Sequence, residues 1–490
     1  TNGGFGIAEA FYANVPMIIL TEFSNYYGIS QFGSYQLGNA EYGGIDLRNM
    51  YKAMTKRTFV ANHPHEVYFA MQQAIKHATS GKPGPCAVVA DWDALMGMIM
   101  EPRLVKPYPF QPLEGYLNVK PPCINDDDAR KMAELLAEAD EPIMMCGRGV
   151  HASKAYDEIQ EIAELLGIPI ATSYMGKACI PETHDLAVGT TGDIGQKIAN
   201  VLMGNADVIL AVGTSLTMDN TKNCSFDFIH PRYQKILHID IDPRNAGWTY
   251  PIELGVTSDA KLALRAIIDK LKAMDLDIDT KARVQKILEL KADPEMDFYD
   301  CKFFHREKLP LDPERVVKSV NELIRDDDLI LLDAGNNRMW FTKLFQTKQV
   351  LQLIGPGGGA GMSWCASAVL GAAMIRDKGK VIGIIGDGSM MMALYSFEQA
   401  SLRNLPIIYI ILNNSSLGNV RDYLTTKGRK VMEYHEINFT KIAESMGVKG
   451  VKALDFVEFE TAFKEALDRD GPTVIDMIVK RADHNRLTTT

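Results

Sequence analysis

Short apolar segments alternate with amphipathic ones along most of the chain. The apolar segments are rich in Ile and Val, and several end at Gly or Asn, so they predict buried β-strands at residues 15–20, 86–90, 142–146, 169–172, 208–212, 235–241, 329–333, 380–385, 407–413 and 473–479. Between them, apolar residues recur at helical spacing, as in residues 66–79 and 155–166. Strands that alternate with helices predict parallel sheets covered on both faces.

This alternation falls into three blocks, which we expect to be α/β domains at residues 1–100, 126–274 and 310–490. Six prolines between residues 102 and 122 predict an extended linker over residues 101–125, because proline lacks the N–H that regular structure uses. A charged, helix-prone stretch within residues 275–309 forms the second linker. A chain of 490 residues has room for three domains of ordinary size. The expected fold class is therefore α/β, with three doubly wound parallel-sheet domains.

Composition removes several classes of protein. Lys and Arg total 52 against 62 Asp and Glu, a net charge of −10, which argues against a non-specific nucleic-acid binder. No run of about 18 uncharged apolar residues occurs, so we expect no membrane span. The seven cysteines include no close C-x-x-C pair, which argues against a disulfide framework or a zinc ribbon and favours the cytoplasm.

The strongest chemical signal lies in the last block. Gly386, Asp387, Gly388 and Ser389 directly follow one apolar strand, and Asn414 follows the next strand along the chain. Because parallel strands end at the same edge of a sheet, a carboxylate and an amide oxygen can converge there. Such hard oxygen ligands suit Mg²⁺, which usually completes its coordination shell with phosphate oxygens and water. The two glycines let backbone N–H groups approach an anion, so the pattern predicts a magnesium-bridged diphosphate.

This motif resembles the cofactor motif of thiamine diphosphate enzymes. The wider chain is similar to their acetolactate synthase and benzoylformate decarboxylase group, because family-like segments occur in the family's order at residues 80–85, 238–243, 333–340 and 358–364. The resemblance implies that the three blocks are a pyrimidine-binding, a central and a diphosphate-binding domain. It also implies an enzyme that uses thiamine diphosphate and Mg²⁺ to form or break C–C bonds, a transferase or lyase.

The resemblance assigns roles to individual residues. Asp387 and Asn414 are expected to bind Mg²⁺ through their side chains, and Ser416 through its carbonyl. Met362 is expected to support the bent cofactor, and the Ala360 carbonyl to accept a hydrogen bond from the aminopyrimidine. The remaining cofactor contacts are expected at the diphosphate, from Asn336, Asn337, Gly386, Gly388 and Ser389.

Two features of the family are missing from these residues. The family's catalytic glutamate precedes the Thr-Asn pair that here is Thr1 and Asn2, so it lies upstream of Thr1 and no catalytic residue is assigned. We therefore expect that the first domain lacks about 70 to 90 residues relative to its relatives and falls below normal domain size. The chain as given is then expected to bind cofactor weakly and to turn over slowly or not at all. Residues 214–221 lack the arginine of the family's flavin-binding stretch, which argues against FAD.

The leading hypothesis is an acetolactate synthase-like carboligase or lyase that acts on a small 2-oxo acid. A 2-oxo-acid decarboxylase, a 2-hydroxyacyl-CoA lyase or an oxalyl-CoA decarboxylase remain alternatives, and so does a non-catalytic relative or subunit. In this family the cofactor lies between domains of two chains, so the resemblance implies a homodimer or homotetramer.

Overall fold

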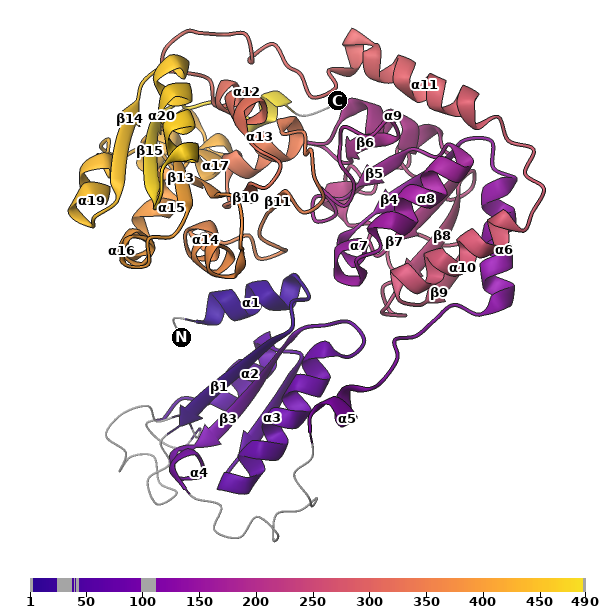
Figure 1. The fold of residues 1–490 in the computed structure, drawn as a ribbon, viewed down its shortest axis with the longest axis horizontal. Coiled ribbons are helices and arrows are strands. Elements are labelled where there is room, and N and C mark those ends of the chain that lie inside the picture. Colours follow the sequence, from indigo (N-terminus) through magenta and orange to yellow (C-terminus); the bar gives the residue numbers. More distant parts are fainter. Residues whose placement is uncertain (1–2, 24–37, 39, 41–43, 98–111, 488–490) are drawn as a thin grey trace. The chain divides into compact units, whose positions relative to one another are not determined.

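The computed structural model describes residues 3–23, 38, 40, 44–97 and 112–487 (Figure 1). It divides into two compact units, Thr1–Pro122 with Gly357–Ala360, and Cys123–Pro356 with Gly361–Thr490. Residues 101–111 of the predicted first linker lie outside the described residues. Every paired strand is parallel to its neighbour, which confirms the parallel α/β fold class.

The first unit holds a three-stranded sheet in the order β1 (Met17–Phe23), β3 (Pro85–Asp91) and β2 (Arg57–Ala61). The central strand β3 is buried along its whole length because its side chains alternate between two covered faces. Cys86, Val88 and Ala90 pack against helix α3 (Pro64–Thr79), whereas Ala87 and Val89 pack with Phe23 on the other face. The helices are α1 (Gly4–Tyr12), α2 (Leu47–Met54), α3 (Pro64–Thr79), α4 (Trp92–Met96) and α5 (Glu114–Leu117).

The second unit begins with a six-stranded sheet whose order is β6 (Ala187–Thr190), β5 (Ile170–Thr172), β4 (Pro142–Cys146), β7 (Val208–Val212), β8 (Lys235–Asp240) and β9 (Leu254–Thr257). Its helices are α6 (Asp126–Ala137), α7 (Arg148–Ser153), α8 (Tyr156–Leu166), α9 (Lys197–Asn205) and α10 (Ala260–Lys272), and α11 (Thr280–Ala292) follows. The acidic run that opens α6 lies in its first turn, where negative charge is favoured, and the Asn125 side chain caps it by accepting from the Asp128 N–H at 2.8 Å.

The other six-stranded sheet of this unit has the order β11 (Leu353–Ile354), β10 (Leu329–Leu332), β12 (Val381–Gly386), β13 (Ile407–Asn413), β15 (Thr473–Ile478) and β14 (Lys449–Ala453). Ile382 and Ile384 of β12 pack in one apolar cluster, and Val381 and Ile385 pack in another, so both faces of the sheet are covered. The covering helices include α12 (Pro313–Leu323), α13 (Asn336–Leu344) and α20 (Phe456–Asp468) on the first face, and α14 (Trp364–Ile375), α16 (Tyr395–Leu402) and α19 (Phe439–Ser445) on the second.

The strand order reverses between β10 and β12. From β10 the chain moves outward to β11, and it then returns to β12 on the opposite side of β10. At such a switch point the two following connections leave toward opposite faces, which opens a crevice at the carboxyl ends of the strands. The residues that follow β10, β12 and β13 therefore occupy the part of this sheet where ligands usually bind.

A buried ion pair in the loop between β5 and β6 is hydrogen-bonded to the segment that precedes β11. Lys177 donates to both carboxylate oxygens of Glu182 at 2.7 Å, and each side chain is only 1% exposed. Glu182 also accepts from the N–H of Thr347 at 2.9 Å and from its hydroxyl at 3.1 Å. Burial lowers the pKa of Lys177, and the Glu182 carboxylate opposes that shift. Because a buried charge without its partner is costly, these contacts fix residues near 180 against those near 347.

All seven cysteines are free thiols. Four of them, Cys86, Cys146, Cys179 and Cys365, are buried. No helix in the described part of the chain is both long and apolar enough to cross a membrane.

Asp476 gives this fold a pH dependence that can be measured. Its fully buried carboxylate accepts from Asn413 Nδ2 at 2.9 Å, and burial raises its pKa from 3.8 to about 6. The folded state thus holds a proton that the unfolded state releases, so this stabilising contribution is present below pH 4 and is lost as the pH rises through 6. Relative to the variant Asp476→Asn, the wild type should lose about 2–3 kcal/mol of unfolding free energy between about pH 4 and pH 7, measured by urea denaturation. Parallel pH profiles for the two proteins would contradict this.

Candidate functional site

Three adjacent strands of the C-terminal sheet each end in a polar residue. Asp333 follows β10, Asp387 follows β12, and Asn414 follows β13. The strand register pairs Gly386 with Leu412, so the tips of β12 and β13 lie side by side. Helix α15 (Asp387–Met391) starts directly after β12, and α17 (Gly418–Asp422) starts shortly after β13 (Figure 1).

Asp387 is almost completely buried at the first position of α15. One carboxylate oxygen, Oδ1, accepts from the Gly388 N–H at 2.9 Å, whereas Oδ2 is buried without a hydrogen-bond partner among the described residues. Burial raises the pKa of this carboxyl group, and the N–H groups of Gly388, Ser415 and Ser416 together with the Tyr434 hydroxyl oppose the rise. An anion held this way has unused capacity on one oxygen, which a cation would fill.

The loop after β13 adds more unpartnered oxygens. The side-chain oxygens of Asn414 and Ser416 are buried and make no hydrogen bond within the part of the chain that the structure describes. Ser415, between the two, has a φ of 53°, in the left-handed region that non-glycine residues rarely adopt. The Ser416 carbonyl accepts from the Gly418 N–H at 2.9 Å and keeps a second lone pair. Because buried polar atoms are normally paired, this cluster fits a ligand that binds oxygen, as Mg²⁺ does.

The two asparagines at the start of α13, Asn336 and Asn337, differ in the hydrogen bonds that their side chains make. Asn336 donates from Nδ2 to the buried carboxylate of Asp422 at 2.7 Å, while its Oδ1 is buried without a partner among the described residues. Asn337 donates from Nδ2 to the Ile384 carbonyl at 2.9 Å, which ties it to β12. A Cβ atom added to Gly418 would come within 3.2 Å of Asn414 Nδ2 and 3.3 Å of Asn336 Nδ2. The structure therefore brings Asn336 and the post-β13 loop together.

Asp333 is a site residue that the sequence reasoning did not single out. Its buried carboxylate accepts from the N–H groups of Ser363 at 3.0 Å and Cys365 at 3.2 Å, so it ties the start of α14 to the tip of β10. Burial raises its pKa, and the Ser389 hydroxyl is the largest of the groups that oppose the rise. The available signal was an aspartate directly after an apolar strand, the same position that Asp387 occupies.

Met362 lies beside these strand ends, whereas Ala360 belongs to the other compact unit. A Cβ atom added to Gly388 would lie 3.6 Å from Met362 Cε and 3.0 Å from the Tyr434 hydroxyl, so Met362 flanks the start of α15. In the first unit, the Ala360 N–H donates to the carboxylate of Glu9 at 2.9 Å.

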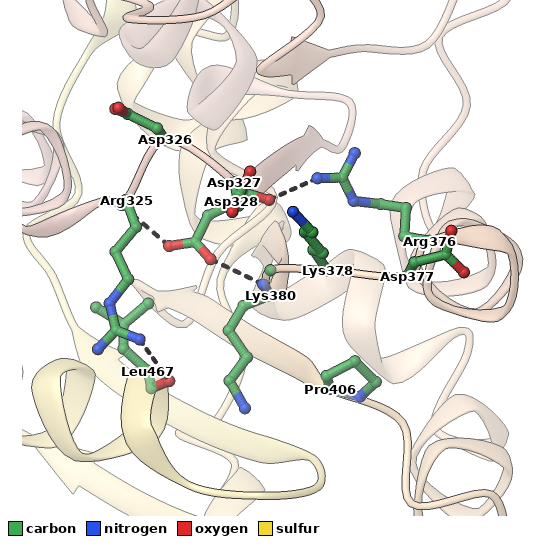
Figure 2. A pocket seen from close by; sticks show the side chains of 11 residues that line it. Arg325, Asp326, Asp327, Asp328, Arg376, Asp377, Lys378, Lys380, Pro406 and Leu467 are labelled. Atoms are coloured by element: carbon green, nitrogen blue, oxygen red, sulfur yellow. Dashed lines mark hydrogen bonds between the residues drawn. The ribbon is translucent and has the colours of Figure 1, made fainter.

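A separate pocket lies at the opposite, amino-terminal edge of the C-terminal sheet. Its volume is about 500 Å³, and Asp328, Lys380 and Pro406, just before β10, β12 and β13, are among its lining residues (Figure 2). Asp328 accepts from the backbone N–H of Arg325 at 3.0 Å and of Lys380 at 2.8 Å. No residue that lines this pocket is among the described residues with a buried, unpartnered side-chain oxygen or nitrogen, so the strand tips remain the candidate site.

No group of three or more His, Cys, Asp or Glu side chains in the described ranges could hold a metal ion. The cluster at the strand tips offers a different donor set, which consists of one carboxylate, one amide oxygen and backbone carbonyls. Such a set leaves several coordination positions for water or ligand oxygens, as is typical of Mg²⁺ bound with a phosphate.

Each of the two six-stranded sheets of the second unit lies largely within a region that matches a known family model. Residues 129–267 match the family model described as the central domain of thiamine pyrophosphate enzymes. Residues 333–477 match the model described as their C-terminal thiamine pyrophosphate binding domain. The second match contains all three strand ends described above.

Relatives align along nearly the whole chain. A probable acetolactate synthase large subunit of Methanocaldococcus jannaschii is 31% identical over 496 residues, covering 99% of this chain and 80% of the relative. The acetolactate synthase large subunit of Haemophilus influenzae is 26% identical and covers 99% and 82%. The isozyme 3 large subunit of Escherichia coli has the same identity and coverage. The chain belongs to the thiamine pyrophosphate (thiamine diphosphate) enzymes.

Proposed function

We propose that the protein is a Mg²⁺-dependent and thiamine diphosphate-dependent carboligase that acts on a small 2-oxo acid, as an acetolactate synthase does. The observation that carries the proposal is the set of buried, unpartnered oxygens at two neighbouring strand tips. Asp387 Oδ2 and Asn414 Oδ1 have no hydrogen-bond partner among the described residues, although each is shielded from solvent. A divalent cation at this point would satisfy both oxygens and anchor a diphosphate.

The proposed metal ligands are the side chains of Asp387 and Asn414 and the carbonyl of Ser416. Asn336 is proposed to contact the diphosphate beside the metal. Its Oδ1 has no hydrogen-bond partner among the described residues, and its side chain lies close to Gly418 in the loop after β13. Asn337 and Ser389, with the backbone of Gly386 and Gly388, complete the proposed diphosphate contacts. The N-terminus of α15 adds backbone N–H groups, but this helix is short, so the metal is the main anchor.

When bound, thiamine diphosphate supplies a nucleophilic carbon and an electron sink for breaking and forming C–C bonds. The chain's own residues would bind and orient it. The side chain of Met362 is 37% exposed and stands beside Gly388, where an apolar group can support a bent ligand. The Ala360 carbonyl is proposed to accept a hydrogen bond from the aminopyrimidine. Orientation of this kind can supply up to roughly 7–11 kcal/mol of a reaction barrier.

The relatives support the choice of reaction. The three described above are all named as acetolactate synthase large subunits or as an isozyme of one, and each aligns with 99% of this chain. For this protein we infer the corresponding reaction, in which one 2-oxo acid loses CO₂ and the remaining acyl unit joins a second 2-oxo acid. We also infer a cytoplasmic location, which the seven free thiols support.

Product analysis of the full-length protein tests this function. With pyruvate, thiamine diphosphate and Mg²⁺ we expect acetolactate and CO₂, and the variant Asp387→Asn should lower the rate about 100-fold or more, because it removes the charged metal ligand. Asp377→Asn, in the pocket at the other edge of the sheet, is the matched control and should keep wild-type activity. Free acetaldehyde as the main product would favour a decarboxylase instead. No consumption of any 2-oxo acid tested, or full activity of Asp387→Asn, would overturn the proposal.

The surface of α14 supports assembly of two copies. Only some of its residues pack inward, although the helix is apolar on all sides, and Met374 and Ile375 are 51% and 83% exposed. The Ser367 hydroxyl of α14 lies 2.6 Å from that of Tyr395, and Met392, three residues before Tyr395 in the sequence, is 63% exposed. A helix that is apolar all round is normally covered, and a second copy of the chain is the cover that a thiamine diphosphate enzyme requires if its cofactor lies between chains.

Light scattering tests this assembly. We expect a dimer or a tetramer for the wild type, and dissociation toward the monomer for Ile375→Lys combined with Met392→Glu, because both place charge on the apolar surface. Val457→Lys, at an exposed position on α20, is the control and should leave the mass unchanged. A monomeric wild type at micromolar concentration would count against the assembly.

A further inference from the structure

Arg481 reaches from the C-terminal segment to the loop that follows β13. It lies shortly after β15, and its Nε donates to the Asn414 carbonyl at 3.0 Å, while Nη2 is 3.4 Å from the Ser415 carbonyl. One guanidinium group therefore holds two consecutive carbonyls of the proposed metal-binding loop. The planar fork of arginine suits such a double contact, whereas lysine has only a single charged point.

The contact with Arg481 fixes how these two peptide groups are turned. In a trans peptide the C=O and the N–H point in opposite directions, so a donor on the Asn414 carbonyl turns the Ser415 N–H away from itself. Arg481 contacts the carbonyls of both peptides, 414–415 and 415–416, and so holds the orientation of each. This orientation sets the direction of the Asn414 side chain and the Ser416 carbonyl.

The loop needs such support because its backbone is strained. Ser415 adopts a φ of 53°, in the left-handed region that is unfavourable for a residue other than glycine. A short antiparallel pairing assists on one side, where the Tyr434 N–H donates to the Ser415 carbonyl at 3.2 Å and the Leu417 N–H to the Met432 carbonyl at 3.0 Å. The Asn414 carbonyl has no such backbone donor among the bonds of the described residues, and Arg481 is what it contacts.

Glu433 holds the guanidinium in place and balances its charge. Arg481 Nη1 lies 2.9 Å from Glu433 Oε2, and the other oxygen of this carboxylate lies 3.9 Å from Arg421 Nε. Arg421 in turn contacts the fully buried carboxylate of Asp422 at 3.1 Å, and Asp422 accepts from Asn336. These contacts form a continuous chain from the C-terminal segment to the proposed diphosphate residue. Because Glu433 offsets its charge, Arg481 can lie beside a cation site without a large repulsive cost.

We propose that Arg481, held by Glu433, is a positioning residue that fixes the loop 414–416 in the conformation that binds Mg²⁺. The proposal rests on the proposed function of this loop. It makes the C-terminal segment part of the metal site, although that segment supplies no ligand. It also predicts that the affinity for Mg²⁺ depends on a residue whose side chain is 38% exposed and carries a positive charge.

The test is a titration of Mg²⁺ into the full-length protein with thiamine diphosphate, measured by calorimetry. Arg481→Met should weaken Mg²⁺ binding about tenfold or more, in the range seen when an outer contact of a metal ligand is lost. Arg481→Lys should fall between Arg481→Met and the wild type, and Glu433→Gln should weaken binding in the same direction. Lys480→Met is the matched control, because it removes a neighbouring positive charge that is 4.0 Å from Asp312 and not on the loop. It should stay within about twofold of the wild type.

Hydrogen exchange without metal or cofactor gives a second readout. The amides of residues 414–418 should exchange faster in Arg481→Met than in the wild type or Lys480→Met. Unchanged or tighter Mg²⁺ binding by Arg481→Met would overturn the proposal, and so would faster exchange with unchanged affinity. If the wild type binds neither Mg²⁺ nor thiamine diphosphate, the proposed function fails, whereas the exchange data still decide whether Arg481 fixes the loop. If Arg481→Met does not fold, Arg481→Lys and Glu433→Gln carry the same comparison.

Discussion

The structure at the strand tips depends on one buried carboxylate that is incompletely paired. Asp387 is closed off from solvent, one of its oxygens has no hydrogen-bond partner among the described residues, and burial raises its pKa. A group in that condition is stable as an anion only when positive charge or donors surround it. The side-chain oxygens of Asn414 and Ser416 also have no partner among the described residues, and this unused acceptor capacity is what the proposed cation would fill.

The sheet topology explains why these groups meet. Strands β12 and β13 are apolar up to their last residues and packed on both faces, which fixes their register and brings their ends to the same level. The strand order reverses between β10 and β12. The connections that follow these strands therefore leave toward opposite faces of the sheet, which opens a crevice at the strand tips. Asp333 then holds the start of α14, and with it Met362, beside the tip of β10. Rigid strands thereby position polar groups that come from loops.

Much of this arrangement could be predicted from the sequence, because its strongest parts are local. Asp387 and Asn414 each follow a long apolar strand, and parallel strands bring such residues to one edge. Strands at the edges of the sheets were missed because they lack a long apolar run. Strand β14 alternates between exposed and buried residues, and β11 has only two residues. Contacts between distant segments gave no local signal. Arg481 is 67 residues from Asn414, and nothing in the sequence near Arg481 shows that its side chain reaches that loop.

Two neighbours in sequence also differ in placement. Ala360 and Met362 are two residues apart and the resemblance gives both a cofactor role, yet the boundary between the compact units runs between them. Spacing along the chain does not reveal such a boundary. The cofactor roles of both residues are proposals.

The most direct measurement of the central claim is the position of the metal itself. Crystals of the full-length protein grown with thiamine diphosphate and Mn²⁺ in place of Mg²⁺ would show the ion by its anomalous scattering. The account predicts one ion within about 2.0–2.3 Å of Asp387 Oδ2, Asn414 Oδ1 and the Ser416 carbonyl, with diphosphate oxygens completing its shell. An ion bound elsewhere, or cofactor bound with no ion between these two strand tips, would contradict it.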